Sequence, residues 1–248
     1  MILSIVMCVF QNIHLTVQSV ENLLQTNIEH ELIIIDNGCT DGTGEYLATK
    51  DIKVITNEVN RSIMPAWNQG LEIATGDYIM FTCNDMIVHP GVARKMIGCF
   101  KLDPKIYCVT TQFTHLAYPD DWWEQAQKIM DEPLEYVIIG PPMPPNPPED
   151  QMMGGCFIVS WKGLDELGSF DENLPIWYSD VDIWCRFRKM GHPVVQVNTL
   201  IHHLESQTTS VITGPDCISI EESGKRFVAK WGECADVISD YQRNPQGP

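Results

Sequence analysis

The chain has little positive charge for its length. Its 248 residues include 16 Lys and Arg against 33 Asp and Glu, which leaves a formal net charge of -17. Proteins that bind nucleic acids or anionic membrane surfaces depend on the opposite balance, because contacts with phosphate supply much of their affinity. The charge therefore argues against a nucleic-acid partner. An anionic small substrate would need local help from a helix N-terminus or a metal ion.

Several motifs and segment types are also absent from the sequence. The nine Cys residues are scattered and include no C-x-x-C pair, which excludes the usual zinc spacing and favours a reducing compartment, so we predict a cytoplasmic protein. No apolar run approaches the ~20 residues of a membrane span, so no transmembrane segment is expected. The apolar start, Met1 to Phe10, lacks the basic residues and cleavage site of a signal peptide and predicts a buried strand. There is no G-x-S-x-G, no P-loop and no G-x-G-x-x-G, so neither a Ser nucleophile elbow nor a glycine-rich phosphate loop is indicated.

Composition and hydrophobic patterning predict one α/β domain over residues 1–248. Hydrophobic residues make up 44% and charged residues 20%, an ordinary globular composition. In the first 110 or so residues strand patterns alternate with helical patterns, which is typical of a mostly parallel central sheet with helices on both faces. We expect strands at 3–10, 32–35, 52–55 and 78–82, and helices at 13–26, from about 40, and at 65–74. Ligands of such sheets bind outside the carboxyl ends of the strands.

The second half of the chain has a different pattern. Residues 112–150 have weak periodicity and a run of prolines, so we expect an irregular segment there. Regular patterns return with a strand at 155–160, a helix at 179–190, an extended segment at 194–201 and an amphipathic helix at 218–231. Ser179 and Asp182 stand at capping-box spacing at the start of the 179–190 helix.

Polar residues follow two of the predicted strands. Asp36 and Asn37 precede Gly38 and can hydrogen-bond a pyrimidine edge and sugar hydroxyls, although Asn-Gly is equally a strong turn dipeptide and these residues alone favour the turn. Asp85, after Cys83 and Asn84, can hold a divalent cation that neutralises a diphosphate, or it is a solvated loop acid.

Two further groups in the second half have both a chemical and a structural interpretation. His202 and His203, with Ser206, can complete an octahedral metal site or be surface imidazoles. Asp180 can act as a general base toward an alcohol, or it can, like Asp182, stabilise the helix start through the dipole. The same dipole predicts that Asp180 stays ionised.

In their order, these segments resemble inverting family 2 glycosyltransferases of the GT-A fold. The resemblance is carried by SIVMCVFQN, by ELIIIDNGCTDGT, by NRSIMPAWNQGLEIATGDYIMFTCNDMIV, by GGCFIVS and GSFDENLPIWYSDVDIWCRFRKMGH, and by HHLESQT. Together they cover about residues 2–210.

The resemblance implies a role for particular residues. It implies a nucleotide-sugar-binding half over residues 1–110 and an acceptor-binding half over 111–240. Asp180 would be the catalytic base, and Asp85 with His203 would hold Mn²⁺ or Mg²⁺. The residues that it places at the nucleotide sugar are Cys8, Val9, Asp36, Asn37, Asn68, Cys83, Asn84 and Asp85.

The implied activity is transfer of a sugar from a nucleotide diphosphate donor, with a UDP-sugar favoured, to a hydroxyl of a glycan, a lipid-linked sugar or another acceptor. One base and no protein nucleophile predict a single displacement with inversion. The sequence departs from the family pattern at Cys83, which replaces the first acid of DXD, at Ser179, which replaces a Glu, and at Ser62, where Gly is common.

Two alternatives to this enzyme stay open. One is a non-catalytic relative that binds glycans or nucleotide sugars, because Cys is a poor ligand for Mg²⁺. The other is a nucleotidyltransferase on a similar sheet, which would need a basic, Gly-rich phosphate loop where residues 8–16 have no Lys or Arg.

Overall fold

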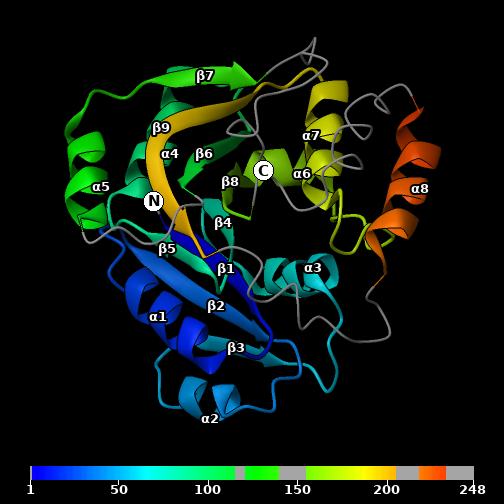
Figure 1. Cartoon of the computed structure of the whole chain (residues 1–248). Helices are drawn as coiled ribbons and strands as arrows, with labels where there is room; N and C mark the ends of the chain where they lie inside the picture. Colours follow the sequence, from blue (N-terminus) through cyan, green and yellow to red (C-terminus); the bar gives the residue numbers. More distant parts are fainter. Residues whose placement is uncertain (1, 115–120, 140–154, 205–217, 233–248) are drawn as a thin grey trace.

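The computed structural model describes residues 2–114, 121–139, 155–204 and 218–232 (Figure 1). Within these ranges the first half of the chain forms a parallel group of strands: β1 (Leu3–Val9), β2 (His30–Asp36), β3 (Lys53–Thr56) and β4 (Tyr78–Cys83). The helices between them are α1 (Ile13–Leu23), α2 (Thr43–Leu47) and α3 (Ile63–Ile73). The predicted alternation of strands and helices is confirmed.

The second half of the chain extends the same sheet with mixed pairing. Its strands are β5 (Met86–Val88), β6 (Cys108–Thr114), β7 (Tyr136–Ile139), β8 (Phe157–Ser160) and β9 (Val194–His203). Its helices are α4 (Val92–Leu102), α5 (Trp122–Asp131), α6 (Trp161–Leu167), α7 (Ser179–Lys189) and α8 (Ile220–Trp231). The strand order is β3-β2-β1-β4-β8-β6-β9-β5, with β7 also paired to β9. Antiparallel β8 lies between β4 and β6 and so joins the two halves in one sheet.

Helices cover both faces of this sheet, as predicted (Figure 1). Side chains alternate between the two faces along a strand, so a strand buried on both sides contributes to two cores. In β1, Ile5 and Met7 pack in one core with residues of α1 and α4, whereas Val6 packs in a second core with residues of α3, α6 and α7. The continuous apolar run at the start of the chain follows from this double burial.

The expectation of an irregular segment over 112–150 is wrong for part of that range. Residues 122–131 form α5, and residues 136–139 form β7, which pairs antiparallel with β9. The pattern hides β7 because it is short and both Val137 and Ile138 are exposed. The proline run lies outside the described residues. None of the helices seen in the described ranges combines the length and the apolarity that crossing a bilayer requires.

Candidate active site

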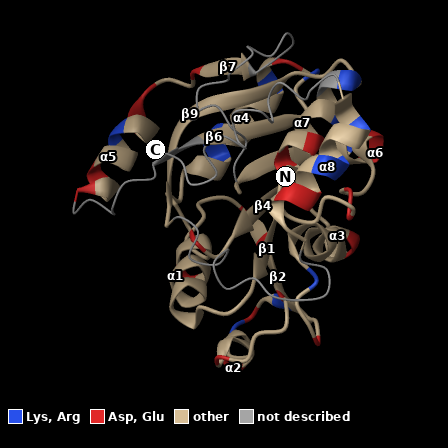
Figure 2. Ribbon diagram, turned by 45° about the vertical axis from the view of Figure 1, so that its right-hand side comes forward, with Lys and Arg blue, Asp and Glu red and all other residues tan. Residues whose placement is uncertain are grey.

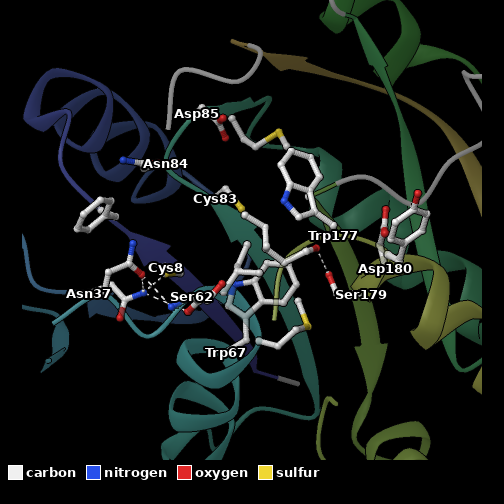
Figure 3. Close-up of a pocket in the computed structure, with 18 of the residues that line it drawn as sticks. Cys8, Asn37, Ser62, Trp67, Cys83, Asn84, Asp85, Trp177, Ser179 and Asp180 are labelled. Atoms are coloured by element: carbon white, nitrogen blue, oxygen red, sulfur yellow. Dashed lines mark hydrogen bonds between the residues drawn. The ribbon is translucent and has the colours of Figure 1, made fainter. Parts of the chain in front are cut away.

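A cavity of about 250 Å³ lies at the carboxyl ends of β1 and β4, beside the starts of α3 and α7. Parallel strands end at one edge of a sheet, so residues that are distant in the sequence meet there. Figure 3 shows labelled side chains from both halves of the chain around this space. The predicted site residues that line the cavity are Cys8, Asn37, Cys83, Asn84, Asp85, Asp180 and His203; Val9, Asp36 and Asn68 are not among its lining residues.

Asp85 follows β4 and lies next to His203, the final residue of β9. β5 and β9 pair antiparallel, with Met86 opposite His203. The Nε2 atom of His203 lies 3.4 Å from Oδ2 of Asp85. Asp85 is 5% exposed, and its Oδ1 atom has no hydrogen-bond partner among the described residues. A buried carboxylate oxygen without a donor is suited to bind a cation. Ser206, predicted beside His203, lies outside the described residues.

Two thiols lie on adjacent strands at the cavity. Cys8 in β1 and Cys83 in β4 are register partners of a parallel pair, and both line the cavity. Burial raises the pKa of the Cys83 thiol well above its ordinary value, and the charge of Asp85 raises it further. Cys83 is therefore a neutral thiol, and it does not supply the negative charge that an acid at this position would bring.

Asn84 lines the cavity, but its side chain also serves the fold. Its Nδ2 atom donates to Oγ1 of Thr16 at 3.1 Å and to the carbonyl of Gln11 at 3.4 Å. The hydroxyl of Ser19 donates to the carbonyl of Asn84 at 2.7 Å. These bonds attach the turn after β4 to α1 and the residues before it, and they hold Asp85 in place.

Asn37 and Asp36 differ in their access to the cavity. Asn37 lines it, and its Nδ2 atom donates to Oδ1 of Asn60 at 2.8 Å and to the carbonyl of Ser62 at 3.1 Å. Asp36 is 3% exposed and accepts a hydrogen bond from the backbone N–H of Cys39 at 2.9 Å. The turn interpretation of Asp36 thus has direct structural support. Asn37, in contrast, both hydrogen-bonds to neighbouring residues of the fold and lines the cavity.

Val9 and Asn68 do not line the cavity and instead make hydrogen bonds within the fold. Val9 is fully buried in the core, and its carbonyl accepts from the backbone N–H of Asn37 at 2.9 Å. Asn68 pairs with the backbone of Phe170: its Nδ2 atom donates to the carbonyl at 3.1 Å, and its Oδ1 atom accepts from the N–H at 2.9 Å. Asn68 therefore fastens α3 to the segment that leads toward α7.

Asp180 lines the cavity from the first turn of α7. Its Oδ1 atom accepts a hydrogen bond from the backbone N–H of Val181 at 2.9 Å. Burial raises the pKa of the Asp180 carboxyl despite that hydrogen bond. Removal of water from the carboxylate outweighs the favourable backbone contacts, so the pKa rises; the expectation that Asp180 is ionised at neutral pH stays a prediction. A carboxylate with a raised pKa is a stronger proton acceptor, as a general base requires.

The predicted capping box at the start of α7 does not form. In a capping box the first hydroxyl accepts from the backbone N–H three residues later. Here the Ser179 hydroxyl donates to the carbonyl of Ile176 at 2.5 Å, and the Asp182 N–H donates to the carbonyl of Tyr178 at 2.9 Å.

Asp182 serves instead as a buried anchor for α8. It is 1% exposed, and its Oδ1 atom accepts from Nε1 of Trp231 at 2.7 Å and lies 2.6 Å from Nζ of Lys230. Figure 2 shows the acidic positions of α7 next to a basic position of α8. These contacts with α8 explain why the Asp182 carboxylate is buried. Asp182 is not among the residues that line the cavity.

The start of α3 contributes residues that the sequence alone did not identify. Ser62 lines the cavity with φ 67° and ψ −177°, a backbone conformation that is essentially restricted to glycine. The carbonyl of Pro175 accepts from the Ser62 hydroxyl at 3.1 Å and from the backbone N–H groups of Ile63 at 3.1 Å and Met64 at 3.0 Å. Trp67 lines the cavity from the next turn. Ser62 was recognised only as a departure from the family pattern, and Trp67 was not singled out.

The residues at Asp85 fit a cation that a substrate also coordinates. No group of three or more metal-ligating side chains occurs within the described ranges. Asp85 and His203 offer one carboxylate oxygen without a donor and one imidazole nitrogen. None of the cavity residues seen in this part of the chain is Lys or Arg. A cation at Asp85 would therefore need further ligands from another molecule.

Comparisons with known proteins agree with this architecture. The sequence profile described as Glycosyl transferase family 2 matches residues 4–178. Poly-beta-1,6-N-acetyl-D-glucosamine synthase of Staphylococcus epidermidis is 35% identical over 86 residues, which are 33% of this chain and 21% of that protein. The synthase of the same name from Staphylococcus aureus strain COL is 35% identical over 97 residues, which are 37% of this chain and 24% of that protein. The chain thus matches about a quarter or less of the length of these curated relatives.

Solved structures share the fold over most of the chain. GalNAc-T7 with UDP, GalNAc and Mn²⁺ superposes with a TM-score of 0.67 at 17% identity, over 94% of this chain and 49% of that one. The mannosyltransferase PcManGT from Pyrobaculum calidifontis, with GDP-Man and Mn²⁺, gives a TM-score of 0.62 at 13% identity, over 99% and 65%. These similarities confirm the predicted α/β fold of the GT-A class.

Proposed function

The chain belongs to glycosyl transferase family 2, and we propose that it transfers a sugar from a nucleotide diphosphate donor to an acceptor hydroxyl with inversion at the anomeric carbon. One observation carries the proposal: Asp180, whose pKa is raised by burial, and the Asp85–His203 pair line the same cavity. A base for the acceptor and a place for a cation at the diphosphate are the two groups that such a transfer needs.

Asp180 acts as the general base. Its carboxylate takes the proton of the acceptor hydroxyl as that oxygen attacks the anomeric carbon, and the bond from this carbon to the diphosphate oxygen breaks. The departing nucleoside diphosphate keeps the electron pair of that bond. A single displacement of this kind inverts the anomeric carbon. Trp177, which lines the cavity near Asp180 in Figure 3, offers an aromatic face on which a sugar ring can stack.

Asp85 and His203 are the residues that would hold Mn²⁺ or Mg²⁺. A bound divalent cation would offset the negative charge of the diphosphate as it departs. Cys83 adds no charge to this position, so Asp85 is the carboxylate on which the cation depends. Neighbours of the same fold were solved with Mn²⁺, which supports a divalent metal without identifying it for this chain.

The nucleotide is proposed to lie over the ends of β1, β2 and β4, against Cys8, Asn37 and Cys83. A uridine nucleotide is favoured by the resemblance to family 2. The acceptor is a hydroxyl of a glycan, a lipid-linked sugar or another molecule.

A transfer assay tests the proposal. Nucleotide sugars with uracil, guanine or adenine bases would be incubated with Mn²⁺ and mixed glycan acceptors, and the release of nucleoside diphosphate would be followed. We expect UDP-sugars to be consumed fastest and NMR of the product to show the inverted anomer. Equal binding of UDP and GDP in a thermal-shift screen would contradict the uracil preference.

The same assay separates an enzyme from a binding module. The neutral Cys83 thiol is the observation that keeps a non-catalytic relative under consideration. Such a protein would be stabilised by UDP-sugars yet would release no UDP with any acceptor or with water.

A further inference from the structure

Trp67 lies at the cavity and carries a buried N–H group without a partner among the described residues. Its side chain is 2% exposed, and the N–H group is that of the indole Nε1 atom. Buried indole N–H groups usually find an acceptor, because an unpaired buried donor is unfavourable. Figure 3 shows the indole extending from α3 among the other lining side chains. An acceptor brought by a ligand would satisfy this donor.

The surroundings of Trp67 fix the position of its ring. The indole contacts Phe81 and Phe157 with ring centroids 5.3 Å and 5.6 Å away, and Phe170 at 6.0 Å. Ile63 and Met64, four and three positions earlier on the same face of α3, also line the cavity. A ring held on several sides keeps its N–H in one direction, which is the preorganisation that a binding group needs.

The other polar groups on this side of the cavity are already engaged. The Asn37 amide donates to Asn60 and to the carbonyl of Ser62, and the Ser62 hydroxyl donates to the carbonyl of Pro175. The Trp67 N–H is the buried donor on α3 that these networks leave unsatisfied within the described residues.

We propose that the Trp67 indole N–H donates a hydrogen bond to an oxygen of the nucleotide part of the bound donor. The proposal rests on the proposed function, because it takes the cavity to be the nucleotide-sugar site. Trp67 is thus a binding residue that contributes equally to UDP and to a UDP-sugar, since the acceptor oxygen belongs to the part that both ligands share.

Trp67→Phe tests this proposal by removing the N–H while keeping an aromatic ring. We expect calorimetry in Mn²⁺ to show that UDP and a UDP-sugar each bind about five- to tenfold more weakly, the loss expected for one neutral hydrogen bond. Trp184→Phe is the matched control, because it makes the same substitution in the same buried cluster at a position that does not line the cavity. It should lower the melting temperature and keep the affinity for UDP.

A second measurement needs no substitution. In ¹⁵N-labelled wild-type protein, UDP should move the Trp67 indole proton downfield, with the resonance assigned through its contacts with the rings of Phe81 and Phe157. The assignment would be overturned if Trp67→Phe bound UDP as tightly as the wild type, or if the indole resonance did not move. It would also be overturned if the variant lost affinity for the UDP-sugar and not for UDP. If the wild type binds no nucleotide at all, the proposed function fails as well, whereas nucleotide binding that Trp67→Phe leaves intact overturns this inference alone.

Discussion

Asp180 and Asp182 are two positions apart in α7, and their carboxylates have opposite surroundings. Asp180 lines the cavity, and burial raises its pKa. Asp182 is buried against α8, where Trp231 and Lys230 approach its Oδ1 atom at 2.7 Å and 2.6 Å. The first carboxylate is desolvated at a cavity, whereas the Oδ1 atom of the second is held by two groups of α8. Substitution of each by Asn therefore has a different expected outcome.

Asp180→Asn should lower the rate of sugar transfer by about 10²–10⁴-fold, the usual effect of removing a general base. The affinity for the donor should stay unchanged, because the acceptor proton is transferred only in the transition state. Rates at saturating donor, together with calorimetry of donor binding, check this expectation. Transfer at nearly the wild-type rate would show that Asp180 is not the base.

The same variant should be more stable than the wild type at neutral pH. A carboxyl whose pKa is raised in the folded protein favours its protonated form there, so its ionisation weakens stability as the pH rises through the folded-state pKa. Asn avoids that ionisation. The melting temperature should therefore increase at pH 7, and the gain should vanish below pH 3.8, the ordinary pKa of Asp, where the carboxyl is protonated in both states. A lower melting temperature at pH 7 would contradict this burial effect.

Asp182→Asn should destabilise the protein and leave the chemistry intact. The substitution removes the charge that Lys230 approaches and weakens the acceptor of the Trp231 N–H, so we expect a loss of about 2–3 kcal/mol in the free energy of unfolding. Denaturant unfolding measures this loss. Turnover per folded molecule at low temperature should stay near the wild-type value, and an inactive, fully stable variant would refute the structural role.

Asp85→Asn should weaken binding of UDP in Mn²⁺ by about 10- to 100-fold, because it removes the carboxylate charge that a cation would need. Chelator should weaken UDP binding to the wild type in the same way and have little further effect on the variant. Calorimetry with and without chelator gives both comparisons. A wild type whose UDP affinity is indifferent to chelator would rule out the metal role of Asp85 and His203.

Cys83→Asp should strengthen binding of Mn²⁺ by about tenfold, since it adds a second carboxylate to the site of Asp85. In chelator the same variant should melt at a lower temperature than the wild type, because two like charges then share a buried position. Cys83→Asn is the control: it should leave Mn²⁺ affinity unchanged and, in chelator, melt at a higher temperature than Cys83→Asp. A variant with unaltered Mn²⁺ affinity would mean that Cys83 does not face the cation.

Ser62→Gly should be more stable than Ser62→Ala by about 1–3 kcal/mol. Both substitutions remove the hydroxyl that donates to Pro175, but only Gly relieves the unfavourable backbone at φ 67° and ψ −177°. Thermal unfolding of the two variants gives the comparison directly. Equal stabilities would show that the backbone at Ser62 relaxes without strain.

The sequence allowed prediction of those features that depend on local pattern and on the geometry of parallel sheets. The apolar run at the start of the chain predicted a strand buried on both faces, and β1 is such a strand. The predicted end of the strand before Asp85 agrees with the end of β4 at Cys83. Asp180 and His203 were assigned to the same site by the resemblance to a family, and the fold brings both to the cavity. The chemistry expected of them stays a prediction.

Other features depend on contacts that no local pattern contains. The partner of Asp182 is Trp231, 49 positions away, so a first-turn acid could not be distinguished from a buried anchor. The direction in which a side chain leaves the end of a strand separates Asn37 from Asp36. The unpaired N–H of Trp67 is defined only by what surrounds it in space.

The carbonyl of Pro175 has a consequence for opening of the cavity. It accepts from the Ser62 hydroxyl and from the N–H groups of Ile63 and Met64, so the segment that leads to Asp180 cannot move away from α3 without breaking all three hydrogen bonds together. The amide protons of Ile63 and Met64 exchange with solvent only when their hydrogen bonds open. Their protection factors should therefore be equal and should report how often the two walls of the cavity separate.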